Sequence, residues 1–218
     1  MRQITAKSMG QAWFTVMRAI MSEGNPCLYT DNAGEEYPVK ELLGLNVIVE
    51  EPHWPDAIIE QNMVLSEFEW MKDNFTRIGT VPALCNADSY ATRLYNYMDT
   101  KNQIDWVVRR LTEEPRLRSA TITTFEPLKD EKYIPCVSLI DFQIENGALQ
   151  MYAYCRALDL GTKAYANFVM LYDILANVAQ RLNLKTGALN LIVKSAHIYD
   201  RNMERVNEIL DANPEIGK

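Results

Sequence analysis

The sequence is poor in histidine and lacks paired cysteines. Only two histidines occur in 218 residues, and the four cysteines, Cys27, Cys85, Cys136 and Cys155, form no Cys-x-x-Cys pair. A structural zinc site needs His, Cys or carboxylate ligands at short spacings, and a chain of this size needs no disulfide to stabilise its core. We therefore expect no metal site and four free thiols.

Long apolar runs and an excess of basic residues are also missing. The first apolar segment, Ala12 to Met21, is interrupted by Arg18 and is shorter than the roughly 18 to 20 residues of a membrane-spanning helix. It has no signal-peptide cleavage pattern. The formal net charge of -7 argues against broad contacts with DNA, RNA or an anionic membrane. We expect a soluble, cytoplasmic protein that binds neither a nucleic acid polymer nor a membrane.

The hydrophobic content of 48% is sufficient for a substantial core, and residues 1–218 are predicted to form a single domain. Helical spacing of apolar residues and capping signals predict helices from Ser8 to Gly24, Asp56 to Lys72, Asn102 to Glu114, Phe168 to Leu182 and from Asp200 onward. Alternating or β-branched residues predict strands over Leu45 to Glu51, Thr121 to Phe125 and Leu189 to Val193. Asn146-Gly147 predicts a hairpin turn. This mixture, without strict βαβ alternation, indicates the α+β class.

One cysteine stands immediately before the predicted hairpin. Pro135-Cys136 would present a thiol at the rigid start of a strand, where a thiolate could attack a substrate, although most cysteines in such positions are only packed in the core. Arg156, at the end of the second hairpin strand, could bring a positive charge near the thiol and lower its pKa. From the residues alone, Arg156 could equally form a surface ion pair.

With these residues, the sequence resembles the thymidylate synthases and the related pyrimidine-nucleotide hydroxymethylases. The motifs that carry the resemblance are Pro135-Cys136, Arg156-x-x-Asp159, Asn167, His197-x-Tyr199 and, less specifically, Glu67-x-x-Trp70 and Tyr90. They keep the spacing of the family, and the similarity extends from Gln11 to Glu208. Ser195 to Tyr199 and the 21 residues after His197 resemble the short, archaeal-type members.

The resemblance implies a mixed β-sheet flanked by helices and a pyrimidine nucleotide, dUMP, as substrate. Cys136 would add to C6 of the pyrimidine, Glu67 and Tyr90 would organise the water that removes the C5 proton, and Asn167 would read the N3 and O4 edge. Asp159 would serve the pterin ring or the backbone near O2. Asn167 favours dUMP over dCMP, because the related deoxycytidylate enzymes are expected to carry aspartate there.

The remaining implied roles concern the sugar, the phosphate and the partner subunit. His197 and Tyr199 would bind the deoxyribose, and Arg156 would bind the substrate. The face of the sheet would form a homodimer in which Arg118 reaches the partner's site in trans. The one-carbon donor would be 5,10-methylenetetrahydrofolate or a methanopterin analogue.

Three alternatives remain open at this stage. The leading expectation is a methyltransferase that makes dTMP from dUMP. The same residues would serve a hydroxymethylase that makes the 5-hydroxymethyl nucleotide from dUMP or dCMP. A catalytically idle nucleotide-binding paralogue is the third alternative, because the expected phosphate site is depleted.

The depletion involves three positions. The chain reads Asp31-Asn32-Ala33-Gly34 where the family has an arginine followed by glycine, Ser119 replaces a second arginine next to Arg118, and Ala157 replaces a serine. Strong donors to a phosphate are thereby lost. Arg116, Arg93 or Lys163 are the candidates to replace them.

Overall fold

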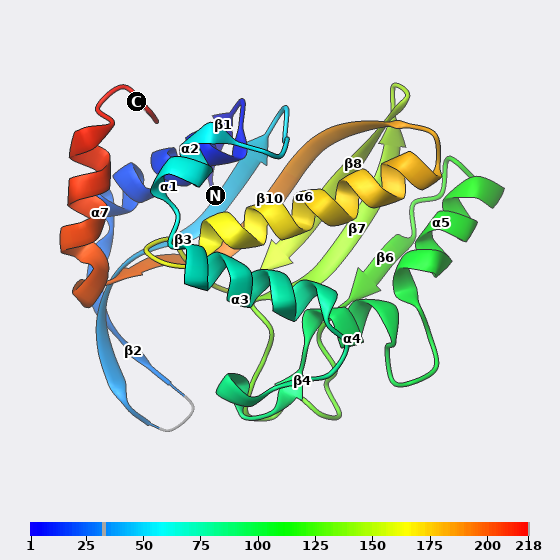
Figure 1. The fold of residues 1–218 in the computed structure, drawn as a ribbon, viewed down its shortest axis with the longest axis horizontal. Coiled ribbons are helices and arrows are strands. Elements are labelled where there is room, and N and C mark those ends of the chain that lie inside the picture. The colour runs from blue at the N-terminus through cyan, green and yellow to red at the C-terminus, as the bar shows by residue number, and fades with distance from the viewer. Residues whose placement is uncertain (32–33, 218) are drawn as a thin grey trace.

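The structure is a computed structural model that describes residues 1–31 and 34–217. Figure 1 shows a curved sheet with helices packed across it. The helices are α1 (Met9–Glu23), α2 (Ala57–Asn62), α3 (Leu65–Thr76), α4 (Tyr90–Tyr95), α5 (Gln103–Glu113), α6 (Ala164–Arg181) and α7 (Asp200–Ala212), with a short 3-10 helix at Pro82–Leu84. None of the described helices combines the length and apolarity that crossing a bilayer requires.

The described strands form one large sheet and one small hairpin. The large sheet contains β1 (Arg2–Ala6), β2 (Asn25–Thr30), β3 (Glu36–Val49), β6 (Ala120–Thr123), β7 (Val137–Glu145), β8 (Ala148–Cys155), β9 (Leu158–Asp159) and β10 (Lys185–Tyr199). The small hairpin pairs β4 (Thr80–Val81) with β5 (Ala87–Asp88).

The large sheet is mixed. Its central order is β1-β3-β10-β8-β7-β6, with β2 paired to β3 and β9 paired to β10. β10 runs parallel to β8 and antiparallel to β3, whereas β7 is antiparallel to both of its neighbours. The α+β class and the mixed sheet flanked by helices are therefore confirmed.

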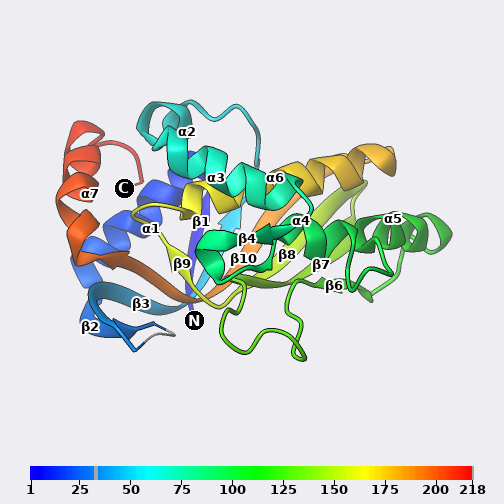
Figure 2. The ribbon, with the colours of Figure 1, turned by 60° about the horizontal axis from the view of Figure 1, so that its bottom comes forward.

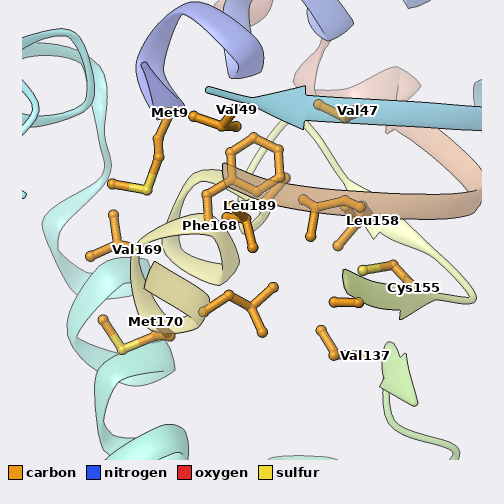
Figure 3. Packing of buried hydrophobic residues seen from close by; sticks show 14 of the residues in the cluster. Met9, Val47, Val49, Val137, Cys155, Leu158, Phe168, Val169, Met170 and Leu189 are labelled. Carbon is orange, nitrogen blue, oxygen red and sulfur yellow. The ribbon is translucent and has the colours of Figure 1, made fainter. Parts of the chain in front are cut away.

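The core lies between the sheet and the helices α1, α3 and α6, which occupy the same side of the sheet (Figure 2). Phe168 of α6 is fully buried and lies beside Val49 and Leu189 of the sheet (Figure 3). Trp13 of α1 is also fully buried, and its indole N–H donates to the carbonyl of Leu160 at 2.8 Å. This bond attaches α1 to the segment that leads into α6.

The hairpin and the first helix follow their predicted signals. Asn146 and Gly147 have φ angles of 50° and 78°, as a tight turn with two positive φ angles requires. Ser8 caps α1 by accepting from the amide of Gln11, and Gly24 ends the helix. These two predictions are confirmed.

The single helix predicted from Asp56 to Lys72 is wrong, because the structure has α2 and α3 with a break between them. The break at Val64 is held by a distant residue of α6. The Tyr165 hydroxyl accepts from the Val64 amide at 3.0 Å and donates to its carbonyl at 3.2 Å. Apolar spacing alone cannot reveal this tertiary contact.

Two strands are much longer than predicted, and both extensions bear on the site. β3 begins at Glu36 and β10 continues to Tyr199, where the two strands still pair. His197 and Tyr199 therefore lie on a strand. α7 follows at once, and Asp200 is its first helical residue, not its cap as predicted.

Candidate active site

A cavity of about 410 Å³ opens where α3, α6 and the first turn of α7 meet the ends of the strands β7, β8 and β10. Eight of the nine site residues expected from the sequence line it, namely Cys136, Glu67, Tyr90, Arg156, Asp159, Asn167, His197 and Tyr199. Two other cavities of about 420 Å³ contain none of the nine. The expected constellation therefore converges on a single cavity of ligand size.

Cys136 lies immediately before β7, next to the end of β8. Its carbonyl accepts from the Arg156 amide at 2.8 Å, so the two residues are neighbours across the hairpin. Burial raises the pKa of the Cys136 thiol, while the positive charges of Arg156 and Lys163 lower it. Arg156 acts in the expected direction, but burial outweighs it, and the thiol is protonated at neutral pH in the free protein.

The guanidinium of Arg156 is held by the chain segment that precedes Cys136. Its Nε and one terminal nitrogen donate to the carbonyl of Ile134 at 2.9 and 2.6 Å. An arginine has five N–H donors in a planar fork. The second terminal nitrogen is not used in these two bonds and is available for a bound anion.

Tyr90 begins α4, which Ser89 caps. Its ring stacks on Phe75 with centroids 4.2 Å apart, and its hydroxyl oxygen accepts from the Val137 amide at 2.9 Å. Burial raises its pKa well above the usual range. Tyr90 is therefore a neutral phenol beside Cys136, and its proton remains available for donation.

Asn167 in the first turn of α6 is only 4% exposed. Its side-chain nitrogen donates to the carbonyl of Lys163 at 3.0 Å, but its side-chain oxygen is buried without a hydrogen-bond partner in the described residues. A buried, unpaired acceptor costs about 1 to 3 kcal/mol. Such an atom on a cavity wall points to a ligand that donates a hydrogen bond to it.

The two carboxylates of the cavity have different surroundings. Asp159 accepts from the Gly161 amide at 3.0 Å and from the hydroxyl of Thr162, so the turn before α6 fixes its orientation. Glu67, half-buried on α3, lines the same cavity. Between the two helices the Lys163 amine lies 4.9 Å from the ring centre of Trp70.

His197 and Tyr199 project from the end of β10. His197 is buried, and it pairs in register with Asp159 of β9. Burial lowers the pKa of its imidazole, which is therefore neutral at neutral pH. One ring nitrogen lies 3.4 Å from the Ser195 hydroxyl, which in turn donates to Glu41. Burial raises the pKa of Tyr199 to about 12, so its hydroxyl carries a proton.

Sequence reasoning missed several residues of the cavity wall. Tyr29 of β2 stacks parallel to His197 with ring centres 6.3 Å apart, and Tyr133, whose pKa is raised by burial, lies near Cys136. Arg201 and Asn202 of α7 also line the cavity. A single tyrosine or arginine outside a motif carries no positional signal, so only the fold reveals these four residues.

Three expected cations lie elsewhere. Arg118 is exposed just before β6 and does not line the cavity, so its role in trans stays a prediction. Arg93 as a replacement phosphate ligand is wrong. Its buried guanidinium binds both carboxylate oxygens of Asp130 at 2.7 Å. Arg116 is exposed outside the cavity, and Asn32 and Ala33 lie outside the described residues.

Comparison with known proteins shows which family the sequence matches. The family described as thymidylate synthase matches residues 12–217 of this chain. A protein of Methanosarcina acetivorans that carries the provisional name thymidylate synthase is 30% identical over 216 residues, which cover 96% of this chain and 94% of that protein. Proteins with the same name are 28% identical in Methanosarcina barkeri, with the same coverage, and 25% identical in Methanopyrus kandleri, covering 92% of this chain and 94% of the relative. This chain belongs to the thymidylate synthase family.

Proposed function

We propose that this protein converts dUMP to dTMP by transferring a one-carbon unit to C5 through a covalent adduct on Cys136. The observation that carries the proposal is the placement of two groups on one cavity wall. Cys136 and Asn167 line the same cavity, and the buried side-chain oxygen of Asn167 has no hydrogen-bond partner in the described residues. A nucleophile for C6 and an acceptor for the N3–H group of uracil are thus available together.

The first step would be addition of sulfur to the base. The Cys136 thiol gives its proton to water, Sγ bonds to C6, and the C5=C6 electron pair moves toward O4 as an enolate. The Asn167 side-chain nitrogen uses one N–H on Lys163 and has a second N–H for O4. The charge of Arg156, which lowers the pKa of Cys136, favours the thiolate in this step.

When bound, a methylene-carrying reduced pterin supplies the one-carbon unit and the hydride that makes it a methyl group. Folate and methanopterin derivatives share this chemistry. The cavity fits a planar polar ring, because Trp70 offers an aromatic face and the oriented carboxylate of Asp159 is an acceptor for ring N–H groups. Trp70, Asp159 and Lys163 are the residues that would hold the donor.

The C5 proton must leave after the new carbon–carbon bond has formed. Glu67 and Tyr90 both line the cavity, and a water between them would accept this proton. Tyr90 keeps its hydroxyl proton at neutral pH, so it orients the water and Glu67 provides the negative charge. The C6–S bond then breaks and Cys136 leaves as the thiolate.

The neutral His197 imidazole and the Tyr199 hydroxyl, which line the same cavity, would bind the deoxyribose hydroxyl. His197 is held by Ser195 and Glu41, so its free nitrogen has a fixed direction. Two neutral groups suit a neutral sugar, because neither places an unpaired charge against it. Tyr29, which lines the same cavity, lies parallel to the imidazole with ring centres 6.3 Å apart.

The test uses dUMP labelled with tritium at C5, together with a methylene-pterin donor. Wild-type protein is expected to release tritium to water, and Cys136→Ala is expected to abolish the release. Cys27→Ser is the matched control, because Cys27 is exposed on β2 and does not line the cavity. Undiminished release by Cys136→Ala would refute the proposed nucleophile. The mass of the product distinguishes methyl from hydroxymethyl transfer.

A further inference from the structure

The cavity contains a guanidinium that belongs to none of the sequence motifs. Arg201, in the first turn of α7, lines the cavity together with Arg156, His197 and Tyr199. Its side chain is exposed to solvent. It therefore adds a permanent positive charge at the end of the cavity where β10 finishes.

Two aromatic rings position this guanidinium. Its central carbon lies 4.7 Å from the ring centre of Tyr199 and 5.8 Å from that of Tyr37. The two rings meet edge to face with centres 6.1 Å apart. Contact with ring faces holds an arginine without using its N–H groups. Arg201 is thereby oriented while its donors stay available.

Within the described residues, no hydrogen bond or ion pair engages the Arg201 guanidinium, in contrast to the other arginines near the cavity. Arg205 donates to the carbonyls of Gly161 and Asn62, and Arg93 is paired with Asp130. An oriented arginine with unused donors on a cavity wall is suited to bidentate binding of an anion.

The position of Arg201 indicates which anion it binds. Tyr199 and His197 flank it at the end of β10, and both are assigned to the sugar in the proposed function. Arg201 therefore lies beside the groups proposed to hold the sugar, from which the 5' phosphate extends. Lys163, in contrast, lies over Trp70 on the side of the donor.

We infer that Arg201 binds the 5' phosphate of the nucleotide together with Arg156 and so selects a nucleoside monophosphate over the free nucleoside. This inference rests on the proposed function for the identity of the nucleotide. It assigns phosphate recognition to a residue on α7, next to the sugar-binding pair, in place of the depleted donors.

The test measures binding of dUMP and of deoxyuridine by calorimetry. Arg201→Gln keeps an unbranched polar side chain and removes the charge. We expect it to weaken dUMP binding about 10- to 100-fold, as loss of a charge-assisted hydrogen-bond pair does, and to change deoxyuridine binding less than about twofold. Arg201→Lys should recover part of the lost affinity. Arg109→Gln, on the exposed surface of α5 and outside the cavity, makes the same charge change and should leave dUMP binding unaltered.

Each outcome bears on the inference separately from the reaction. Equal weakening of dUMP and deoxyuridine, unchanged dUMP binding, or a wild-type protein without preference for dUMP over deoxyuridine would overturn the role of Arg201. Weakened binding of the pterin donor with unchanged dUMP binding would do the same. Tritium release from C5 tests the proposed reaction independently, so a phosphate-dependent loss of affinity without tritium release would support Arg201 and refute the reaction.

Discussion

At the scale of single residues, the protonation state of Cys136 is set by two opposing effects. Burial disfavours the thiolate and raises the pKa, while the positive charge of Arg156 lowers it. Without the charge of Arg156, burial and the negative charge of Asp159 still raise the pKa of the thiol, and only Lys163 lowers it. The pKa of the thiol must then rise further.

We therefore predict that alkylation of Cys136 by iodoacetamide increases with pH, with a midpoint above that of an ordinary cysteine. Arg156→Gln should move the midpoint to higher pH. Peptide mass spectrometry reports each site separately, and the exposed Cys85 in the same sample is the internal control. A midpoint below that of Cys85, or a downward shift in Arg156→Gln, would contradict the account.

Asn167 allows a second prediction at this scale. Its unpaired oxygen suits the N3–H group of uracil, whereas N3 of cytosine is an acceptor and would face it unfavourably. Asn167→Asp presents a carboxyl group that accepts from the amino group of cytosine. We expect this variant to lose about 10- to 100-fold in affinity for dUMP and to gain preference for dCMP, because one buried mismatch costs about 1 to 3 kcal/mol. Equilibrium binding of both nucleotides provides the measurement, and an unchanged preference would argue against contact between Asn167 and the base.

The sequence permitted eight cavity residues to be predicted because their motifs keep a fixed spacing. Cys136, Arg156, Asn167 and His197 belong to that set. Arg201 was missed because it belongs to none of these motifs, and its place on the cavity wall depends on how α7 packs at the end of β10. The chemistry of a motif can be read along the chain, but the additional residues that complete a wall depend on the tertiary fold.

At the scale of elements, a buried ion pair joins α4 to the loop after β6. Arg93 and Asp130 have side chains that are 2% and 4% exposed. The same guanidinium also donates to the backbone carbonyls of Asp88 and Thr124, and Asp130 accepts from the amide of Glu126. The pair therefore links α4, which begins with Tyr90, to the loop that contains Tyr133. Both tyrosines line the cavity.

Asp130→Ala should destabilise the protein by about 3 to 5 kcal/mol, because it leaves the Arg93 charge buried without its partner. Urea unfolding followed by circular dichroism measures this change. Arg109→Ala is the matched control, since Arg109 and Glu113 form a pair on the surface of α5 with side chains 64% and 50% exposed, and an exposed pair contributes at most about 1 kcal/mol. Equal effects of the two substitutions would contradict the assigned importance of burial.

The elements themselves were predicted with uneven success for identifiable reasons. Local signals, such as the cap at Ser8 and the Asn146-Gly147 turn, depend on neighbouring residues and were read correctly. The break at Val64 depends on Tyr165, which is distant in sequence. The extension of β10 to Tyr199 depends on pairing with β3, which a single strand pattern does not reveal.

At the scale of the whole molecule, the helices α1, α3 and α6 pack on one face of the sheet, and none of the three covers the other face (Figure 2). Leu139, Tyr154 and Ile192 are neighbours in register on β7, β8 and β10. Each is 37% to 40% exposed. A contiguous apolar patch on a sheet face is typical of a protein interface. This patch is consistent with the homodimer that the sequence resemblance predicts. The parallel pairing of β8 with β10, which aligns Tyr154 with Ile192, could not be predicted from the strand patterns.

The predicted homodimer can be tested through shared sites. Light scattering should give twice the mass of one chain, and Tyr154→Lys with Ile192→Lys should give a folded monomer, because buried unpaired charges oppose association. Arg118 lies outside the cavity of its own chain, and the sequence resemblance predicts that it acts on the partner's site. Mixing Cys136→Ala with Arg118→Ala chains should then restore about a quarter of the wild-type sites, because half of the dimers are mixed and each has one complete site.

The matched control replaces Arg118→Ala with Arg156→Ala in the same mixture. Arg156 lines the cavity of its own chain, so a Cys136→Ala subunit cannot supply it to the partner, and mixed dimers contain no complete site. Restoration in the first mixture and its absence in the second would separate action in trans from simple stabilisation by a normal subunit. Tritium release from C5 of dUMP is the readout. If neither mixture recovers activity, Arg118 does not complete the partner's site, and the cavity must bind its nucleotide with the cations of one chain, Arg156 and Arg201.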